Sequence, residues 1–200
     1  RVYITWWTNI RFEKTFNMDL CALLAKSGCI AVTGGLEVAS DRLLKKMKKG
    51  VDIGQVARVT NAFTQNGIMV HAYLMYGFPT QTEQETIDSL EVVRQLFEHN
   101  CIQSAFWHQF TTTVHSPIGV NPDDFDITIT GPAFEGFAQN DLWHEDPKGA
   151  EHANYKKGLN LALHNYLNGI GLDMELQDWF EFEIPETSHS YQLIENYLNN

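Results

Sequence analysis

One candidate ligand-binding residue is Glu37, which follows the buried-strand pattern of residues 29–32 and the pair Gly34-Gly35. Ligands of α/β proteins bind where parallel strands end, and a carboxylate there accepts two hydroxyl or ammonium donors at once. Glu37 could instead be a helix-capping acid, because Ser40 and Asp41 follow it at the start of a predicted helix. Ser40 is then either a second polar contact or an N-cap serine.

A second candidate segment is the turn Gly77-Phe78-Pro79. It ends residues 68–76, the strongest strand pattern in the sequence, and it precedes Thr82 and Glu85, which have the spacing of a capping box. A glycine in such a turn lets the backbone pass close to a ligand. Glycine and proline also shape strand-to-helix turns without any ligand, so both interpretations stay open.

The elements that would position these residues alternate between strand and helix through residues 1–115. The segments 2–7, 29–32, 68–76 and 102–110 are rich in β-formers, and amphipathic helix patterns lie between them. Nearly continuous apolar strands separated by helices predict a parallel sheet with right-handed crossovers. Four strands neither close a barrel nor leave a clean edge, so this sheet requires neighbours.

The remaining residues differ in composition. Residues 116–147 contain several proline, glycine and aspartate residues and predict a loop-rich connector, with a short strand at 126–130. Residues 148–200 predict an α-rich extension. We expect its helices over residues 148–170, 174–180 and 191–198.

Charge is unevenly distributed along the chain. Residues 1–100 have a net charge of +1 and residues 101–200 have −12, within a total of −11. The acidic half repels nucleic-acid phosphates, and the basic residues between Arg42 and Lys49 have the helical spacing of a solvated face. No apolar stretch approaches the roughly 20 residues of a membrane span. We therefore expect neither nucleic acid nor a membrane as a partner.

The three cysteines and the histidines favour no metal site. Cys21, Cys29 and Cys101 are odd in number and far apart, which indicates neither a disulfide framework nor a metal site and favours a reducing cytoplasm. The residues Asp141-x2-His144-x-Asp146 imitate a metal loop, but Pro147 beside them favours a polar turn. We assign no metal to this chain.

Two motifs and their spacing resemble the radical S-adenosylmethionine superfamily. Residues 34–50, GGLEVASDRLLKKMKKG, resemble the pattern G-x-E-S-x-S-D-x-x-L-x-x-M-x-K-G at the end of the fourth barrel strand. Residues 76–82, YGFPTQT, are similar to the G-F-P-G-E-T turn after the fifth strand, and residues 66–70 resemble the start of that strand. The resemblance covers roughly residues 2–118. It indicates the subgroup whose full-length members often carry an N-terminal cobalamin-binding domain.

The resemblance implies the last four strand–helix units of a six-stranded, TIM-like partial (β/α) barrel. The two missing units, about 60 residues at ~30 per unit, would carry the C-x3-C-x2-C motif that this chain lacks. Three thiolates of that motif hold a [4Fe–4S] cluster, which cleaves S-adenosylmethionine reductively to a 5′-deoxyadenosyl radical. We therefore expect the C-terminal fragment of a cytoplasmic Fe–S oxidoreductase. The longer protein would bind S-adenosylmethionine and the cluster, with cobalamin as a further candidate, and the fragment alone would bind none and be inactive.

The resemblance also assigns roles to rim residues. Glu37 would bind the ribose or the methionine amine of S-adenosylmethionine, with Ser40 beside it. Val38 replaces the family's usual serine, which removes one polar contact. Arg11 follows the first strand on the same rim. It would reach the cofactor carboxylate or an anionic substrate, or else pair with Glu13 at the surface.

The turn and the last strand would lie near the adenine. Residues 77–79 would bring their backbone close to it, with Phe78 or Met75 as an apolar surface. Thr80-Gln81 replaces the family's Gly-Glu and removes a carboxylate. Trp107 and His108 lie on the last strand, where family members approach the adenine through backbone atoms. His108 would touch substrate, or be a hydrogen-bonded core or surface residue.

Two other functions stay open. An ordinary β/α-barrel lyase would use Glu37 and His108 as acid and base. A non-catalytic interaction module would bind a partner or the rest of its own polypeptide. The expected partner in the main interpretation is the missing N-terminal part of the same chain. The open sheet also predicts self-association, or cover by the protein's own tail.

Overall fold

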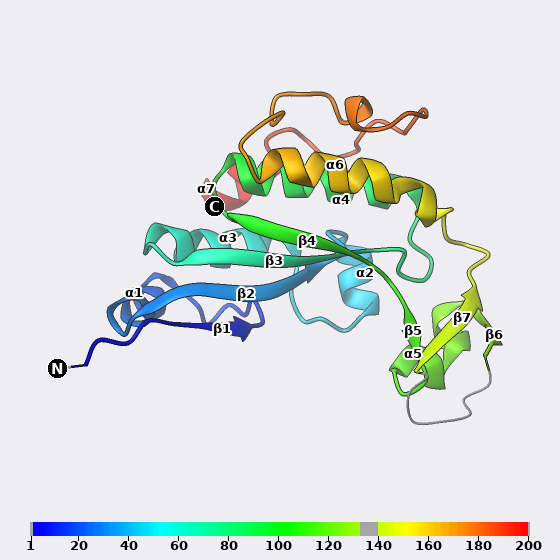
Figure 1. Ribbon diagram of the computed structural model, residues 1–200, viewed down its shortest axis with the longest axis horizontal. Helices are drawn as coiled ribbons and strands as arrows, with labels where there is room; N and C mark the ends of the chain where they lie inside the picture. Colours follow the sequence, from blue (N-terminus) through cyan, green and yellow to red (C-terminus); the bar gives the residue numbers. More distant parts are fainter. Residues whose placement is uncertain (1, 133–139, 200) are drawn as a thin grey trace.

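A four-stranded parallel sheet forms the centre of the computed structural model, which describes residues 2–132 and 140–199 (Figure 1). Its order is β1-β2-β3-β4. The strands are β1 (Trp6–Ile10), β2 (Cys29–Glu37), β3 (Met69–Tyr76) and β4 (Ser104–Gln109). All three pairings are parallel, which confirms the predicted sheet. β1 begins at Trp6 and not at Val2, because residues 2–4 are exposed and make no ladder.

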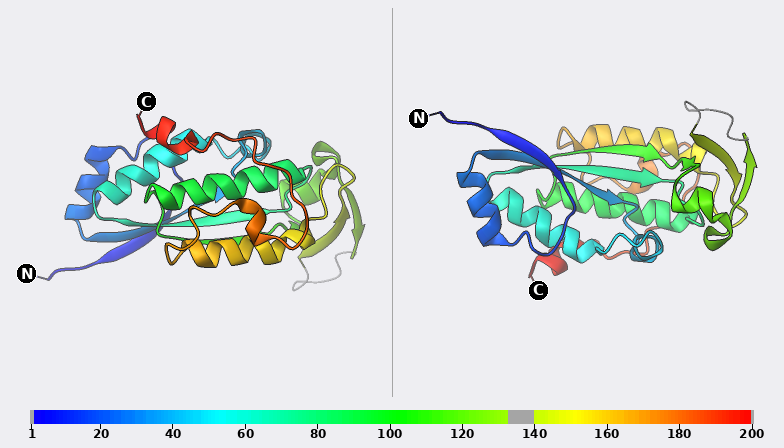
Figure 2. Two further views of the ribbon diagram at one scale, coloured as in Figure 1. Left: turned by 90° about the horizontal axis from the view of Figure 1, so that it is seen from above. Right: turned by 90° about the horizontal axis from the view of Figure 1, so that it is seen from below.

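Helices cover one face of this sheet (Figure 2). The connecting helices are α1 (Met18–Lys26), α2 (Asp41–Lys46), α3 (Ile53–Gln65) and α4 (Glu83–Glu98). Each begins after a polar N-cap whose side chain accepts a backbone N–H of the first turn: Asn17, Ser40, Asp52 and Thr82. The predicted capping box of Thr82 and Glu85 is present at α4.

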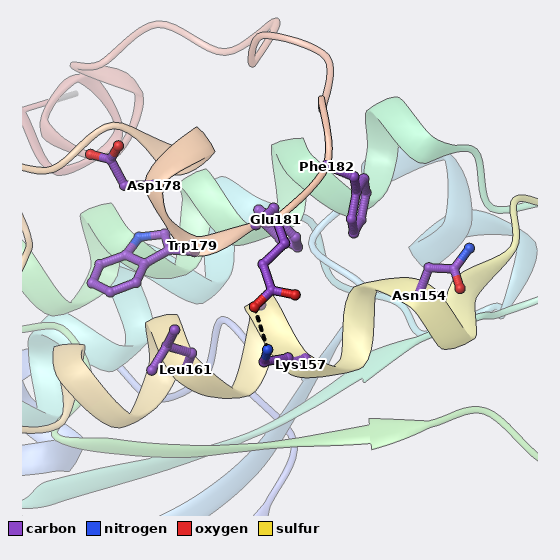
Figure 3. Close-up of a pocket in the computed structure, with 9 residues that line it drawn as sticks. Asn154, Lys157, Leu161, Asp178, Trp179, Glu181 and Phe182 are labelled. Atoms are coloured by element: carbon purple, nitrogen blue, oxygen red, sulfur yellow. Dashed lines mark hydrogen bonds and ion pairs between the residues drawn. The ribbon is translucent and has the colours of Figure 1, made fainter.

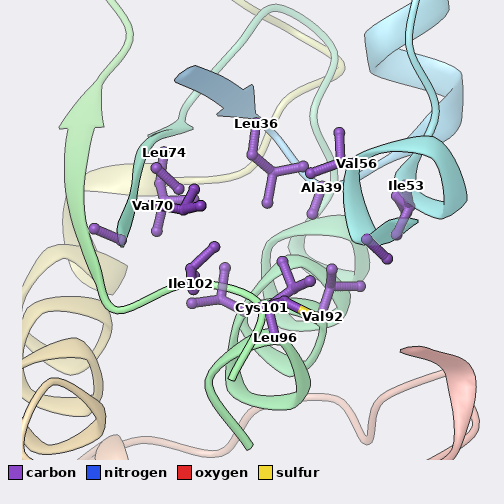
Figure 4. Close-up of a cluster of buried hydrophobic side chains, with 14 of the residues drawn as sticks. Leu36, Ala39, Ile53, Val56, Val70, Leu74, Val92, Leu96, Cys101 and Ile102 are labelled. Atoms are coloured by element: carbon purple, nitrogen blue, oxygen red, sulfur yellow. The ribbon is translucent and has the colours of Figure 1, made fainter. Parts of the chain in front are cut away.

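The main core lies between the sheet and the helices (Figure 4). Leu36, Val70 and Leu74 point from β2 and β3 toward this layer, and each is almost completely buried. The helices contribute Val56 and Leu96, among others, to the same cluster. Burial of each such side chain contributes about 1.5–3 kcal/mol, so this face of the sheet stabilises the fold. The opposite face is uncovered in the described part of the chain.

A second, antiparallel sheet lies beyond the C-terminal ends of the four parallel strands (Figure 1). Its order is β5 (Thr112–Thr113), β7 (Asp141–Glu145), β6 (Thr128–Gly131), with α5 (Pro117–Val120) and a 3-10 helix, η1 (Pro122–Phe125), in between. Only β6 corresponds to a predicted strand. β5 has two residues and β7 is mostly polar, so neither carries a strand pattern in sequence.

The last region packs against strand β4 and against the helices α3 and α4. It contains the 3-10 helix η2 (His152–Tyr155), α6 (Lys156–Tyr166), the 3-10 helix η3 (Leu176–Trp179) and α7 (Leu193–Asn199). The helix predicted over 148–170 is shorter because the Asp146 side chain caps a turn at Lys148 and Gly149. The helix predicted over 174–180 is a single 3-10 turn. No helix in the described part of the chain combines the length and apolarity needed to cross a bilayer.

Candidate functional site at the C-terminal rim of the sheet

Three of the predicted site residues lie at one edge of the sheet. Glu37 is the last residue of β2 and pairs with Leu74, three residues before Gly77. Ile10, which precedes Arg11, pairs with Gly34 of β2. Since all strands are parallel, Arg11, Glu37 and Gly77 share the C-terminal rim. This is the edge where α/β sheets bind ligands.

Glu37 has a left-handed backbone conformation, with φ of 61°. Non-glycine residues in this conformation are strained by about 1–2 kcal/mol, and such strain clusters at functional sites. The carboxylate lies over Gly35, at a position that a Cβ on residue 35 would occupy. Gly35 therefore makes room for the Glu37 side chain on the uncovered face of the sheet.

The Glu37 carboxylate has a cationic partner that sequence reasoning missed. Lys49 Nζ forms an ion pair with Glu37 Oε1, and both side chains are mostly buried. Arg11 Nη2 donates to the Lys49 carbonyl and Arg11 Nε lies 3.9 Å from Glu13 Oε1. Lys49 follows a helix in a run of lysines. Nothing in the sequence therefore distinguished it from the neighbouring lysines of a solvated face.

In this rim group the Lys49 ammonium pairs with the Glu37 carboxylate, and Arg11 lies beside them through its contact with the Lys49 carbonyl. Glu37 can accept hydrogen bonds from hydroxyl or ammonium groups, whereas Lys49 and Arg11 can donate to a carboxylate. This combination of one acceptor and two donors therefore fits the hydroxyl, ammonium and carboxylate groups of an amino-acid or nucleoside ligand.

Ser40 is engaged within the protein. Its hydroxyl caps α2 by accepting from Leu43 N–H at 3.4 Å and donates to Glu85 Oε1 at 2.8 Å. Arg42 forms a bidentate pair with the same carboxylate, with Nε–Oε1 of 2.8 Å and Nη2–Oε2 of 2.6 Å. Of the two roles that the sequence left open for Ser40, its hydrogen bonds are those of an N-cap.

The turn at residues 77–79 is held from within by Gln81. Its buried side-chain oxygen accepts from Gly77 N–H at 2.8 Å and Phe78 N–H at 3.2 Å, and its nitrogen donates to Thr86 Oγ1 at 3.0 Å. An amide can do both, whereas an ionised carboxylate only accepts. Thr80 has φ of 70°, so this position favours glycine, the residue that the resembled motif carries.

The two apolar candidates beside this turn point in different directions. Phe78 is buried in a second cluster with Phe110 and Phe125, at ring distances of 5.2 and 6.2 Å. It is therefore part of the contact with the antiparallel sheet and not an open surface. Met75 is half-buried on the uncovered face of β3.

Trp107 and His108 lie on opposite faces of β4. Trp107 is 4% exposed, its ring is 6.3 Å from that of Tyr76 of β3 on the helix-covered face, and its Nε1 has no hydrogen-bond partner among the described residues. His108 lies on the uncovered face, 4.6 Å from the Phe106 ring and 5.7 Å from the Tyr73 ring. Of the two, only His108 can reach a ligand on that face.

Most of the possible metal loop is strand β7 (Asp141–Glu145), so the predicted polar turn is wrong there, and only Asp146 belongs to a turn. Asp146 Oδ2 accepts from Thr80 N–H at 2.7 Å, and Oδ1 accepts from Gly149 N–H at 2.9 Å. Within the described residues, no group of three or more His, Cys, Asp or Glu side chains could hold a metal ion. Burial raises the pKa of Cys21 and Cys101 to about 11, so these thiols stay protonated at neutral pH.

Several pockets lie near the tail, and two of them border α6 or the rim. One, of about 330 Å³, lies between α6 and residues 178–182, where Lys157 and Glu181 form an ion pair at 2.5 Å (Figure 3). It contains no predicted site residue. The other, of about 550 Å³, joins the rim residue Gly77 to His144 and His152. Burial lowers the pKa of His152, although the Asp146 charge and the Gln81 carbonyl oppose this, so its imidazole is neutral at pH 7.

Comparison with known proteins gives a family match over the sheet. Residues 9–93 match the model of the Radical SAM superfamily. The uncharacterized methyltransferase PH0819 of Pyrococcus horikoshii is 27% identical over 90 residues, which are 45% of this chain and 20% of that protein.

Among solved structures, this chain is similar to the radical S-adenosylmethionine methyltransferase TsrM of Kitasatospora setae. Its structure with tryptophan substrate and a SAM analog has a TM-score of 0.59 at 15% identity, covering 78% of this chain and 35% of that chain. Its structure with cobalamin and a [4Fe–4S] cluster has a TM-score of 0.49 at 20% identity, covering 57% and 21%. The match at 0.59 confirms the predicted fold class. This chain spans about a fifth of the curated relative and about a third of that solved structure.

Proposed function

This chain belongs, through residues 9–93, to the radical SAM superfamily, and on that premise we propose that its C-terminal rim binds S-adenosylmethionine within a longer polypeptide. The observation that carries the proposal is the shared rim of Glu37 and the Gly77 turn on neighbouring strands. A [4Fe–4S] cluster held by another part of that polypeptide would reduce the bound cofactor. The fragment alone would then have no turnover.

The rim residues would divide the polar groups of the cofactor between them. Glu37 would accept from the methionine ammonium or the ribose hydroxyls, and Lys49 and Arg11 would donate to the carboxylate. The backbone of residues 77–79 would pass beside the adenine, with Met75 as the apolar surface. When bound beside a reduced cluster, S-adenosylmethionine supplies the 5′-deoxyadenosyl radical or a methyl group.

The reaction class that we propose for the longer protein is methyl transfer. Support comes from the names of both relatives, each of which is called a methyltransferase. The motif resemblance supports cobalamin as a further cofactor of the longer protein. The three free, buried cysteines support a reducing, cytoplasmic location.

Equilibrium dialysis of S-adenosylmethionine tests the assignment in a longer polypeptide that carries both this chain and the cluster motif. After anaerobic reconstitution, Glu37→Gln should weaken binding at least ~10-fold, because the loss of one charge-assisted contact has about this effect. The cluster absorbance should not change. Glu195→Gln, at an exposed position of α7 away from the rim, is the matched control.

The outcomes separate the alternatives. Unchanged binding by the Glu37 variant would refute the rim assignment. A colourless protein that converts substrate in air would support the lyase alternative, and a protein that neither binds S-adenosylmethionine nor forms 5′-deoxyadenosine would support an interaction module.

A further inference from the structure

Side chains on the uncovered face of the sheet form rows that cross the strands. In one row, Asn9 pairs with Thr33, Thr33 pairs with His71, and His71 pairs with Ser104. We call these four residues the polar row. Each strand contributes one member. None of the four is an acidic residue, a lysine or an arginine.

Apolar rows lie on both sides of the polar row. Toward the N-terminal ends of the strands, Trp7, Ala31 and Met69 are in register. Toward the C-terminal ends, Tyr73 and Phe106 are in register and are 42% and 52% exposed. The polar row is therefore bordered by open aromatic surface on the side of the rim.

The polar row is only partly satisfied by its own members. Ser104 Oγ and His71 Nδ1 are 2.8 Å apart, which orients the imidazole, and Nε2 makes no hydrogen bond to any described residue. The side chains of Asn9 and Thr33 make no hydrogen bond to any residue that the structure describes. Burial, and after it the charge of His108, lowers the pKa of His71, so the imidazole is neutral at pH 7.

A packed barrel fills this depth with bulky branched side chains, so a polar row here needs another explanation. We propose that the polar row and the Tyr73–Phe106 pair bind a planar ligand that carries a neutral polar group, such as a carboxamide or a ring N–H. The ring would pack on Tyr73 and Phe106, and the polar group would pair with His71 and Thr33. The inference rests on the proposed function only in taking this face as the inside of the barrel.

The absence of charge from the row selects the ligand class. An ionised carboxylate or ammonium group would meet no opposite charge among the four residues of the polar row, whereas a neutral carboxamide can both donate to and accept from their side chains. The charged residues of this face, Glu37, Lys49 and Arg11, lie at the rim beyond the aromatic pair. A ligand could therefore place a charged end at the rim and its neutral end in the polar row.

Titration of the 200-residue chain with benzamide, followed by the NMR shifts of the His71 ring, tests the proposal. Benzamide has about nine non-hydrogen atoms, so saturation on the order of 10 mM is expected. Benzoate and benzylamine, which have similar shapes and carry a charge, should bind at least ~5-fold more weakly.

Variants locate the site. Thr33→Val keeps the side-chain shape, so folding is retained. Its benzamide affinity, measured from the His71 shifts, should fall at least ~3-fold. His71→Ala should lower the affinity further, as measured from the Phe106 ring shifts. His164→Gln, on the outer face of α6, should bind benzamide as the original protein does.

Equal binding of the charged probes, or no saturable shift, would overturn the proposal. A dimer in sedimentation that Phe106→Asp abolishes would also overturn it, because a second copy of the chain would then cover this face. None of these measurements involves S-adenosylmethionine or a cluster. The ligand proposal and the rim assignment can therefore fail separately.

Discussion

Glu91 and Arg94 are ionisable residues one turn apart on α4, with side chains 0% and 8% exposed. Arg94 makes two hydrogen bonds to the Glu91 carboxylate, at 2.7 and 2.8 Å, and donates to the Leu172 carbonyl at 2.6 Å. Hydrogen bonding to Glu91 raises the pKa of Arg94. A buried charge is tolerated only with its partner, so the two residues act as one unit.

Replacing Arg94 by methionine should therefore lower the free energy of unfolding by about 3–5 kcal/mol, because Glu91 would be left buried without its cation. Urea denaturation followed by circular dichroism measures this change. Lys157→Met, which breaks an ion pair at the surface, is the control and should change the stability little. Similar losses in both variants would contradict the role assigned to burial.

A second residue-level prediction concerns acid. Burial acts to raise the pKa of Glu85, but hydrogen bonds from Arg42, from Thr82 N–H and from Ser40 outweigh burial and lower it from its ordinary 4.5. A carboxyl whose pKa is lowered by folding contributes stability above its unfolded pKa and loses that contribution as pH falls through the folded value.

The urea midpoint should therefore fall more steeply for the original protein than for Glu85→Gln between about pH 6 and pH 3. At the upper end the variant should be the less stable of the two, since it lacks the ionic hydrogen bonds. Glu13→Gln, at an exposed pair, should follow the original curve. Parallel curves for the Glu85 variant and the original protein would show that the depressed pKa has no consequence for stability.

At the scale of elements, the tail is held on α4 by polar contacts. Asp88 accepts from Thr187 Oγ1 at 2.9 Å, from Ser188 N–H at 2.7 Å and from Ser188 Oγ at 2.6 Å. Gln95 donates to the Ser190 carbonyl and accepts from Ile194 N–H. If the tail left α4, these side chains would form hydrogen bonds to water instead. The bonds therefore contribute to stability only while the tail stays in place.

Asp88→Ala should loosen residues 186–190 without unfolding α4. Hydrogen exchange of the Ser188 amide should become at least ~10-fold faster, whereas amides inside α4 should keep their protection. Asp178→Ala, at an exposed position of the same tail, provides the control. Faster exchange throughout α4 would mean that the tail and the helix open as one unit.

At the scale of the whole molecule, the tail completes the helical layer. Ile194 of α7 is fully buried, and α7 packs against both α3 and α4. Tyr166 of α6 accepts a hydrogen bond from Trp179 Nε1 at 3.0 Å. The apolar outer face of the helices is therefore covered on this side, whereas the other face of the sheet is not.

Removal of residues 171–200 should expose this apolar surface. We expect increased binding of the dye ANS and a broad thermal transition in place of a cooperative one, because specific packing would be lost before secondary structure. Calorimetry and dye fluorescence measure both effects. A truncated protein that melts cooperatively at the original temperature would show that the tail is an independent appendage.

Predictability from sequence differed between the parts of this protein. The four parallel strands and the α4 capping box followed from local patterns, because runs of β-forming residues and N-cap spacing each leave a short-range signal. The antiparallel sheet had no such signal in Thr112–Thr113 or Asp141–Glu145. The lengths of the tail helices were wrong where a side chain, Asp146, competed with helix hydrogen bonds.

For the rim, motif order placed Glu37, Arg11 and Gly77 on one edge, because parallel strands direct all their C-terminal ends the same way. Which partner each side chain meets was a different matter. The Lys49 ion pair, the Ser40–Glu85 bond and the polar row across β1 to β4 join residues distant in sequence. Sequence alone thus determined the fold class and the edge that carries the rim residues, since both depend on local periodicity. Only the tertiary structure decided which charges meet and which face stays open, because register and packing bring distant residues into contact.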